Sequence, residues 1–335
     1  MVRYMLVGLA LATSASGLAG QAVLTKMEAV SGPTVIDKTT QTEDIRFRNE
    51  GYERMTVPVR LSGTGPYRFL VDTGASRTAI SRELAARLKL VAGGDASLHS
   101  VAGVSTVSTA TVPDLQLTRK AIKVIDAPVL ESSNMGADGI LGVDSLRSQR
   151  VMFDFEGQTI SIVPSVSRTV RDEPGAIVIQ GVRRNGRLIV TEATVNGRNV
   201  TVVLDTGSQV TIGNDALRKQ LLRRKNVNAA QLVELQSVTG EKISGEYMFV
   251  RELKMGDVGL NNLAIVFANA HTFKQLQLND RPAILLGMNA IRAFKKVSID
   301  FATLKFRVVL PQPSENNVEV ASPHATDWST ARQGG

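Results

Sequence analysis

Short apolar runs, separated by glycine and polar turn residues, follow one another along most of the 335-residue chain. Val, Ile, Leu and Thr recur in these runs, whereas aromatic residues make up only 4% of the sequence. Short runs of this kind, bounded by turn signals, are typical of strands rather than long helices. The pattern therefore predicts a mainly β protein, and its length is sufficient for two domains with separate apolar cores.

One ordered series of motifs occurs twice along the chain. A strand, a turn and a second strand lead into Asp-Thr-Gly at 56–74 and again at 189–207, so Asp205 follows Asp72 by 133 positions. In each half a glycine-bearing turn, an apolar pair with glycine and a closing pair of strands follow in the same order. The turns are Ser100-Val101-Ala102-Gly103 and Ser237-Val238-Thr239-Gly240, and the apolar segments are Ile140-Leu141-Gly142 and Leu285-Leu286-Gly287. Such a duplication predicts two similar lobes, at 52–165 and 187–310, joined by a connection at 166–186.

The two ends of the chain differ from these lobes. Residues 1–22 combine Arg3, an apolar run and a segment of small residues, a pattern that indicates a secretory signal peptide; an uncleaved membrane anchor is the alternative. We therefore expect a periplasmic or extracellular protein with no membrane span after signal removal. Residues 23–51 are polar and fit a linker, a pro-segment or a first strand, and the proline-containing tail at 311–335 is predicted to be disordered.

Composition excludes several kinds of chemistry. The absence of cysteine excludes disulfides, thiolate nucleophiles and cysteine-ligated zinc. His99, His271 and His324 are far apart and lack ligand spacing, so neither a metal site nor a Ser-His-Asp triad is predicted, and no cofactor is expected. The formal net charge of +8 comes from scattered basic residues, which argues against nucleic-acid binding. Acid–base chemistry in this protein must rely on carboxylates.

The paired tripeptides supply two such carboxylates. Each follows three apolar residues and holds the same place in its repeat, which makes coincidence a poor explanation. Hydrolysis of a peptide bond without a metal or covalent nucleophile needs one group to accept a proton from water while another donates a proton to the carbonyl oxygen. Two carboxyls held close together do both, because they cannot both ionise cheaply and share one proton; this pairing in aspartic proteases is itself a standard example of the effect. Asp72 and Asp205 are therefore the candidate catalytic pair.

From Tyr52 to Leu310 the sequence resembles the pepsin and retropepsin superfamily of aspartic peptidases. The resemblance implies two similar acid-protease lobes related by a pseudo-two-fold axis, with an active-site cleft between them, and an extended polypeptide as substrate. Asp72 and Asp205 would be catalytic, the two glycine-bearing turns would lie in flaps over the cleft, and the apolar segments would lie under the active-site loops. The active-site turns would comprise Thr73, Gly74 and Ala75 in one lobe and Thr206, Gly207 and Ser208 in the other, with the threonine hydroxyls placed to brace the opposite lobe.

The sequence departs from the pepsin pattern in having no disulfides, no tyrosine in the first turn and short lobes, and it looks closer to a fused bacterial retropepsin-like pair. Ala75 follows the first tripeptide, whereas Ser208 follows the second. We expect the Ser208 hydroxyl to donate to the Asp205 carboxylate, which favours the ionised form of Asp205 and leaves Asp72 protonated more often.

Other functions and residues were weighed beside this interpretation. A catalytically inactive, envelope-located peptide-binding module on the same fold is the alternative function, although both halves keep the complete tripeptide. Because both half-sites lie in one chain, a monomer is expected rather than a homodimer that uses one half of each chain. Asp154 and Asp300 are expected to make structural hydrogen bonds, His99 to lie on the surface, and Ser81 to cap a helix.

Overall fold

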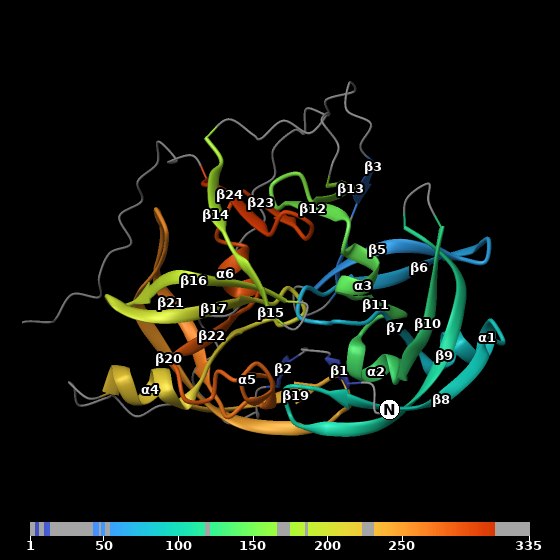
Figure 1. The fold of residues 1–335 in the computed structure, drawn as a ribbon, viewed down its shortest axis with the longest axis horizontal. Coiled ribbons are helices and arrows are strands. Elements are labelled where there is room, and N and C mark those ends of the chain that lie inside the picture. Colours follow the sequence, from blue (N-terminus) through green and yellow to red (C-terminus); the bar gives the residue numbers. More distant parts are fainter. Residues whose placement is uncertain are drawn as a thin grey trace, which may run out of the picture.

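The computed structural model describes residues 4–6, 10–13, 43–46, 48–50, 54–117, 121–165, 175–184, 187–222 and 231–311. Its strands form two nine-stranded sheets and one six-stranded sheet (Figure 1). Each nine-stranded sheet builds one lobe, and the six-stranded sheet joins the lobes. A mainly β, two-lobed architecture is therefore confirmed, and the predicted tail at 311–335 lies almost entirely outside the described residues.

The first lobe has strand order β1-β8-β9-β10-β7-β11-β6-β5-β4, in which β11 lies parallel to β6 and antiparallel to β7. Its strands are β1 (Tyr4–Leu6), β4 (Arg48–Glu50), β5 (Arg54–Leu61), β6 (Thr64–Val71), β7 (Ala79–Ser81), β8 (Val91–His99), β9 (Val104–Gln116), β10 (Ala121–Leu130) and β11 (Gly139–Leu141). Its helices are short: α1 (Arg82–Arg87), α2 (Ser132–Met135) and α3 (Val143–Leu146). The Ser81 side chain accepts a hydrogen bond from the Leu84 amide at 3.1 Å, so the predicted helix cap is confirmed.

The second lobe repeats this order as β15-β16-β17-β22-β18-β21-β20-β19-β2. Its strands are β2 (Ala10–Thr13), β15 (Val182–Arg184), β16 (Arg187–Val195), β17 (Arg198–Leu204), β18 (Thr211–Gly213), β19 (Gln231–Ser237), β20 (Lys242–Met255), β21 (Val258–Phe267) and β22 (Ala283–Leu286), and its helices are α4 (Asp215–Leu222), α5 (His271–Gln275) and α6 (Met288–Ile291). Here β22 lies parallel to β17, as β11 does to β6. The sequence repeat is thus a structural repeat.

The lobes share the six-stranded sheet, ordered β14-β24-β23-β12-β13-β3, with β3 (Glu43–Arg46), β12 (Gln149–Asp154), β13 (Thr159–Pro164), β14 (Ile177–Gln180), β23 (Lys296–Asp300) and β24 (Lys305–Val309). Strands β12 and β23 pair antiparallel at its centre, with Arg150 opposite Asp300. Arg150 Nε lies 3.4 Å from Asp300 Oδ2, and the Ser165 hydroxyl donates to Asp300 Oδ1 at 2.6 Å. Asp154 accepts from the Gly157 amide at 2.8 Å and pairs with Lys296. Both carboxylates therefore have the structural roles expected of them.

Residues 23–51, for which a first strand was one of three alternatives, and residues 166–186, expected to be a connection, both contain strands. β3 and β4 lie within 23–51, and β14 and β15 lie within 166–186. The two pairs match: β3 and β14 are the outer strands of the shared sheet, and β4 and β15 each begin a hairpin that leads into a lobe. Each structural repeat therefore begins before the sequence repeat at 52 and 187. These strands are only three or four residues long, and β3, β4 and β15 are mostly polar or charged, so the hydrophobic pattern did not define their bounds.

Branched and aliphatic side chains fill the interior, as the pattern predicted. Phe69, Phe153 and Phe306 are almost fully enclosed, and one apolar cluster runs from both nine-stranded sheets into the shared sheet. The cluster therefore connects the two lobes through the shared sheet. Among the described residues, no helix is both long and apolar enough to cross a membrane.

Candidate active site

The two Asp-Thr-Gly tripeptides lie at equivalent places, each directly after the strand that precedes it. Asp72 follows β6 and its amide donates to the Leu141 carbonyl at 3.0 Å; Asp205 follows β17 and its amide donates to the Leu286 carbonyl at 3.0 Å. The acceptors are the last residues of β11 and β22, the two predicted apolar-apolar-Gly segments. Ile140-Leu141-Gly142 and Leu285-Leu286-Gly287 therefore lie beside the active-site turns, as expected.

Thr73 and Thr206 bind each other's lobes reciprocally. The Thr73 hydroxyl donates to the Leu204 carbonyl at 3.0 Å, and the Thr206 hydroxyl donates to the Val71 carbonyl at 2.8 Å. Each hydroxyl also accepts the backbone N–H of the other threonine, at 3.0 and 3.1 Å. Each hydroxyl thus donates one buried hydrogen bond and accepts another. The four bonds confirm the predicted brace between the lobes.

The glycines of the tripeptides allow the two turns to approach closely. A Cβ atom at Gly74 would lie 2.5 Å from Asp205 Oδ1, and a Cβ at Gly207 would overlap the Asp72 carboxyl group. Each carboxyl thus lies against the glycine of the opposite lobe. Any larger residue at either glycine would force the pair apart.

Asp72 and Asp205 are both fully enclosed. Asp72 Oδ1 accepts from the amides of Gly74 and Ala75 at 2.7 and 3.0 Å, and Asp205 Oδ1 accepts from the Gly207 amide at 3.1 Å. Within the described structure the Oδ2 atoms receive no hydrogen bond from any group outside the pair. The arrangement leaves one oxygen of each carboxyl for a proton shared between them.

Burial separates the pKa values of both acids from those of ordinary aspartates, and for Asp72 the charge of Asp205 adds to it. Burial, followed by the charge of Asp205, raises the pKa of Asp72 well above its ordinary value of 3.8. Burial also raises the pKa of Asp205 to about 6, against the lowering effects of the Arg187 charge, the Gly207 and Ser208 amides and a hydrogen bond with Asp72. Asp72 is therefore the acid of the pair, and Asp205 is the carboxyl that ionises first.

This order agrees with the predicted one, but the predicted cause is wrong. The Ser208 hydroxyl donates to the Val210 carbonyl at 2.7 Å, so its single proton is not available to Asp205. The Ser208 contribution to the lower pKa of Asp205 comes from its backbone N–H instead. Any residue type supplies that amide, and the difference between Ala75 and Ser208 does not set the asymmetry.

Arg187 is a further charged residue beside the dyad that the sequence reasoning missed. It is the first residue of β16, is completely buried, and its positive charge acts on both Asp205 and Asp72. The sequence repeat could have identified Arg187, because Arg54 lies 133 positions before it and begins β5. The two aspartates are separated by the same offset.

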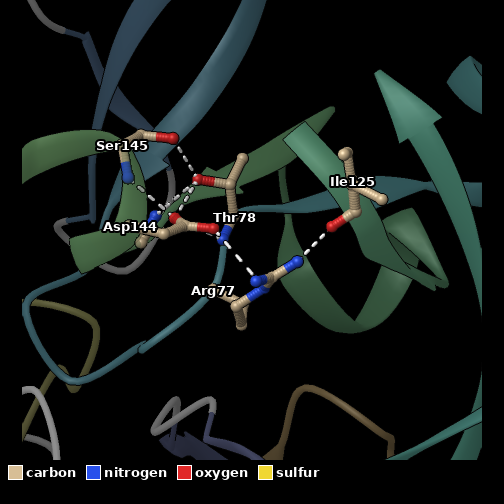
Figure 2. Close-up of polar contacts among 6 residues, drawn as sticks. Arg77, Thr78, Ile125, Asp144 and Ser145 are labelled. Atoms are coloured by element: carbon tan, nitrogen blue, oxygen red, sulfur yellow. Dashed lines mark hydrogen bonds and ion pairs between the residues drawn. The ribbon is translucent and has the colours of Figure 1, made fainter. Parts of the chain in front are cut away.

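Equivalent hydrogen bonds follow the active-site turn in each lobe, and Figure 2 shows those of the first lobe. Asp144 Oδ1 accepts from the Thr78 amide at 2.8 Å and hydroxyl at 2.7 Å, and its Oδ2 lies 3.6 Å from Arg77 Nε. In the second lobe Asn289 Oδ1 accepts the same two bonds from Thr211, both at 2.8 Å. The match of an acid with an amide at these equivalent places indicates a structural role for Asp144.

The predicted flap turns reach the opposite lobe. Val101 packs in an apolar cluster of second-lobe residues that includes Phe273, and Val238 packs in a first-lobe cluster that includes Leu70 and Met135. The other turn residues lie beside them: Ser100 Oγ accepts the amides of Ala102 and Gly103, and Ser237 Oγ bonds to Thr239 next to Gly240. The turns are thus crossed contacts between lobes rather than free tips, and their contact with substrate stays a prediction.

His99 is part of this crossed contact, so its predicted surface location is wrong. It lies at the end of β8 with 8% exposure, and its Nδ1 is 2.9 Å from Nε2 of His271, which begins α5 in the other lobe. The His271 amide also donates to the Val101 carbonyl at 2.8 Å. Burial and then the charge of His271 lower the pKa of His99; burial and then Lys274 lower that of His271. The contact between the two lobes is therefore made by the neutral form of both histidines.

The chain's own N-terminal residues pair with the strands that lead into both turns. β1 is parallel to β8, with Leu6 opposite His99, whereas β2 is antiparallel to β19, with Ala10 opposite Ser237. A pseudo-two-fold axis reverses the direction of equivalent strands, so one extended peptide that crosses it must be parallel to one and antiparallel to the other. The described residues 4–6 and 10–13 have this arrangement.

Among the described residues no group of three histidine or acidic side chains is placed to hold a metal ion. Each of the two lobes contributes one Asp-Thr-Gly turn to a buried pair of carboxyls. This arrangement defines an acid-protease fold with a bilobal aspartyl site. The sequence model of the aspartyl protease family matches residues 57–145 and 191–290, one stretch in each lobe. The chain belongs to this aspartyl protease family. A search of curated proteins found no match.

Proposed function

We propose that this protein is an aspartic endopeptidase that hydrolyses peptide bonds with a water molecule activated between Asp72 and Asp205. One observation carries the proposal: the two carboxyls are enclosed together, and their raised pKa values favour a state in which Asp72 is protonated while Asp205 is ionised. In that state Asp205 accepts a proton from water, and Asp72 donates its proton to the carbonyl oxygen of the scissile bond. The resulting gem-diol collapses as Asp205 gives its proton to the amide nitrogen and a gem-diol hydroxyl returns a proton to Asp72. The C–N bond breaks, and the dyad returns to its starting state.

An extended polypeptide is the proposed substrate. The parallel and antiparallel pairing of residues 4–6 and 10–13 with β8 and β19 supports this, because the same strand edges can take the backbone of another chain by strand addition. Since Thr73 and Thr206 join both half-sites within one chain, we propose a monomer. The amino-terminal pattern at 1–22 supports a periplasmic or extracellular location after removal of a signal peptide.

A peptide library separates an active peptidase from the inactive binding module. Wild type is incubated with the library near pH 5 and near pH 7, with and without pepstatin, and products are identified by mass spectrometry. The proposal expects internal cleavage that pepstatin suppresses and that Asp72→Ala and Asp205→Ala both abolish. Peptide binding without cleavage in wild type would support the inactive module, and equal cleavage by all three proteins would refute the assignment.

A further inference from the structure

Arg187 is a buried cation of the second lobe whose guanidinium makes no hydrogen bond within the described structure. Its relative exposure is 0%, and it is the largest of the fully buried side chains. In the described structure its Nε, Nη1 and Nη2 atoms all lack a hydrogen-bond partner. A guanidinium has five N–H donors and stays protonated in proteins. Such a group is costly to bury unless a hydrogen-bonding partner arrives.

The aspartyl dyad does not supply that partner. Asp205 and Asp72 attract Arg187 through their charges, but neither forms an ion pair with it within 4.0 Å in the described structure. With one proton shared, the dyad also carries a single negative charge. The two strands of the β15–β16 hairpin contain three arginines, Arg183, Arg184 and Arg187, and one acidic residue, Glu192. Their net charge is therefore positive, and the dyad only partly balances it.

The equivalent hairpin of the first lobe has a different pair of residue types at this register position. There Arg54 stands opposite Glu50 in the register of β4 and β5, whereas Arg187 stands opposite Arg184 in the register of β15 and β16. The first-lobe pair has opposite charges, and the second-lobe pair has like charges. In the second lobe, the residue opposite Arg187 in the strand register is thus another arginine and not an acid.

We propose that Arg187 binds a carboxylate of the peptide substrate and so makes this protein selective for an acidic group on one side of the scissile bond. A carboxylate is the partner that fits: its two oxygens match two parallel N–H groups of a guanidinium, whereas an amide oxygen accepts from the same group without compensating its charge. The carboxylate comes either from an acidic side chain or from the C-terminus of the peptide. This inference rests on the proposed function, because the ligand is taken to be the peptide that reaches the dyad.

Binding of paired peptides tests the proposal directly. A peptide cleaved by wild type is remade with Glu or Gln at each position in turn, and separately with a C-terminal acid or amide. Dissociation constants are measured by calorimetry near pH 5, where a free Glu side chain is largely ionised, with the Asp72→Asn protein, which does not turn the peptides over. We expect binding tighter by about tenfold or more for the charged member at one position, or for the free acid, which also identifies the source of the carboxylate.

Two matched variants of the same hairpin decide the role of Arg187. In Arg187→Gln the ratio of the two dissociation constants is expected to fall to about one, whereas Arg184→Gln, which removes the same charge three positions away, is expected to keep the wild-type ratio. Far-ultraviolet circular dichroism establishes that each variant is folded, and Arg187→Met, which also removes the charge, serves as the alternative if Arg187→Gln is not. The proposal is overturned if no position discriminates Glu from Gln, or if the discrimination survives loss of Arg187.

The subsite and the peptidase activity can fail separately. If wild type cleaves peptides but no Glu–Gln pair differs, the activity stands and the subsite is wrong. If the pairs differ in binding but wild type cleaves none of them, the subsite stands and the proposed activity is wrong. Because each comparison is a ratio on one variant at one pH, any effect of Arg187 on the dyad itself cancels.

Discussion

The buried dyad makes stability depend on pH in a way that a single substitution removes. Asp205 has an ordinary pKa of 3.8, and burial raises it to about 6 in the folded protein. A raised pKa means that the folded state binds the proton more tightly than the unfolded state, so this group stabilises the fold fully below about pH 4 and loses that contribution as the pH rises through about 6. The rise corresponds to about 3 kcal/mol at about 1.4 kcal/mol for each pKa unit.

Replacement of Asp205 by Asn tests this value. The amide fills the same space but cannot ionise, and the loss of its charge also removes the repulsion that raises the pKa of Asp72, which acts in the same direction. We expect the stability of Asp205→Asn relative to wild type to increase by about 3 kcal/mol between pH 4 and pH 7. Urea denaturation at the two pH values gives this difference directly, and subtraction between proteins at each pH removes groups common to both.

Asp300 supplies a control with the opposite sign. Burial alone would raise the pKa of Asp300, but hydrogen bonds from Ser165 and Thr303, with the charge of Arg150, outweigh burial and lower it. Its stabilising contribution is therefore present above pH 4 and is lost below, so Asp300→Asn should differ from wild type by a constant amount between pH 4 and 7. A constant difference for Asp205→Asn as well, or one that decreases as the pH rises, would refute the raised pKa of Asp205.

Three further substitutions test the contacts between and beneath the lobes. Thr206→Val leaves two buried backbone groups of the first lobe without partners and should lower the free energy of unfolding by about 2–5 kcal/mol, while Thr206→Ser should keep most of it; equal losses in urea denaturation would contradict the brace. Asp144→Ala should cost about 1–3 kcal/mol and Asp144→Asn clearly less, because Asn289 has the same role in the other lobe; the same denaturation assay refutes this if the order is reversed. Protonation should weaken the contact between His99 and His271 as the pH falls, because both pKa values are lowered in the closed structure. Hydrogen exchange of residues 97–105, corrected for its intrinsic rate, should therefore be faster at pH 5 than at pH 7 in wild type but not in His271→Gln, and an equal pH dependence in both would argue against it.

The sequence was sufficient for the parts of the site that a repeat encodes. The tripeptides, the apolar-apolar-Gly segments and the threonine brace appear in both halves at nearly constant offsets, so each copy supported the other. Ser81 was predictable because a helix cap depends on residues only three positions apart. These features are local or duplicated, and the physical reason for each can be read from the residue type.

Features that depend on contacts between distant segments were not predictable in this way. His99 and His271 are 172 positions apart, and nothing in either segment indicates that they meet. The crossed packing of Val101 and Val238 likewise exists only once both lobes are assembled. The Ser208 prediction failed because a hydroxyl rotates toward the best acceptor nearby, and the residue type does not say which of two acceptors is closer.

The central claim is that Asp72 and Asp205 act as one catalytic unit supplied by two lobes. Measurement of kcat/KM on one library-derived peptide for Asp72→Asn, Asp205→Asn and the double variant tests it most directly, because residues that act together lose their effect together. The account predicts that each single substitution lowers kcat/KM by about 100-fold or more and that the double variant is no worse than either single variant. Full activity in one single variant, or losses that multiply in the double variant, would contradict it.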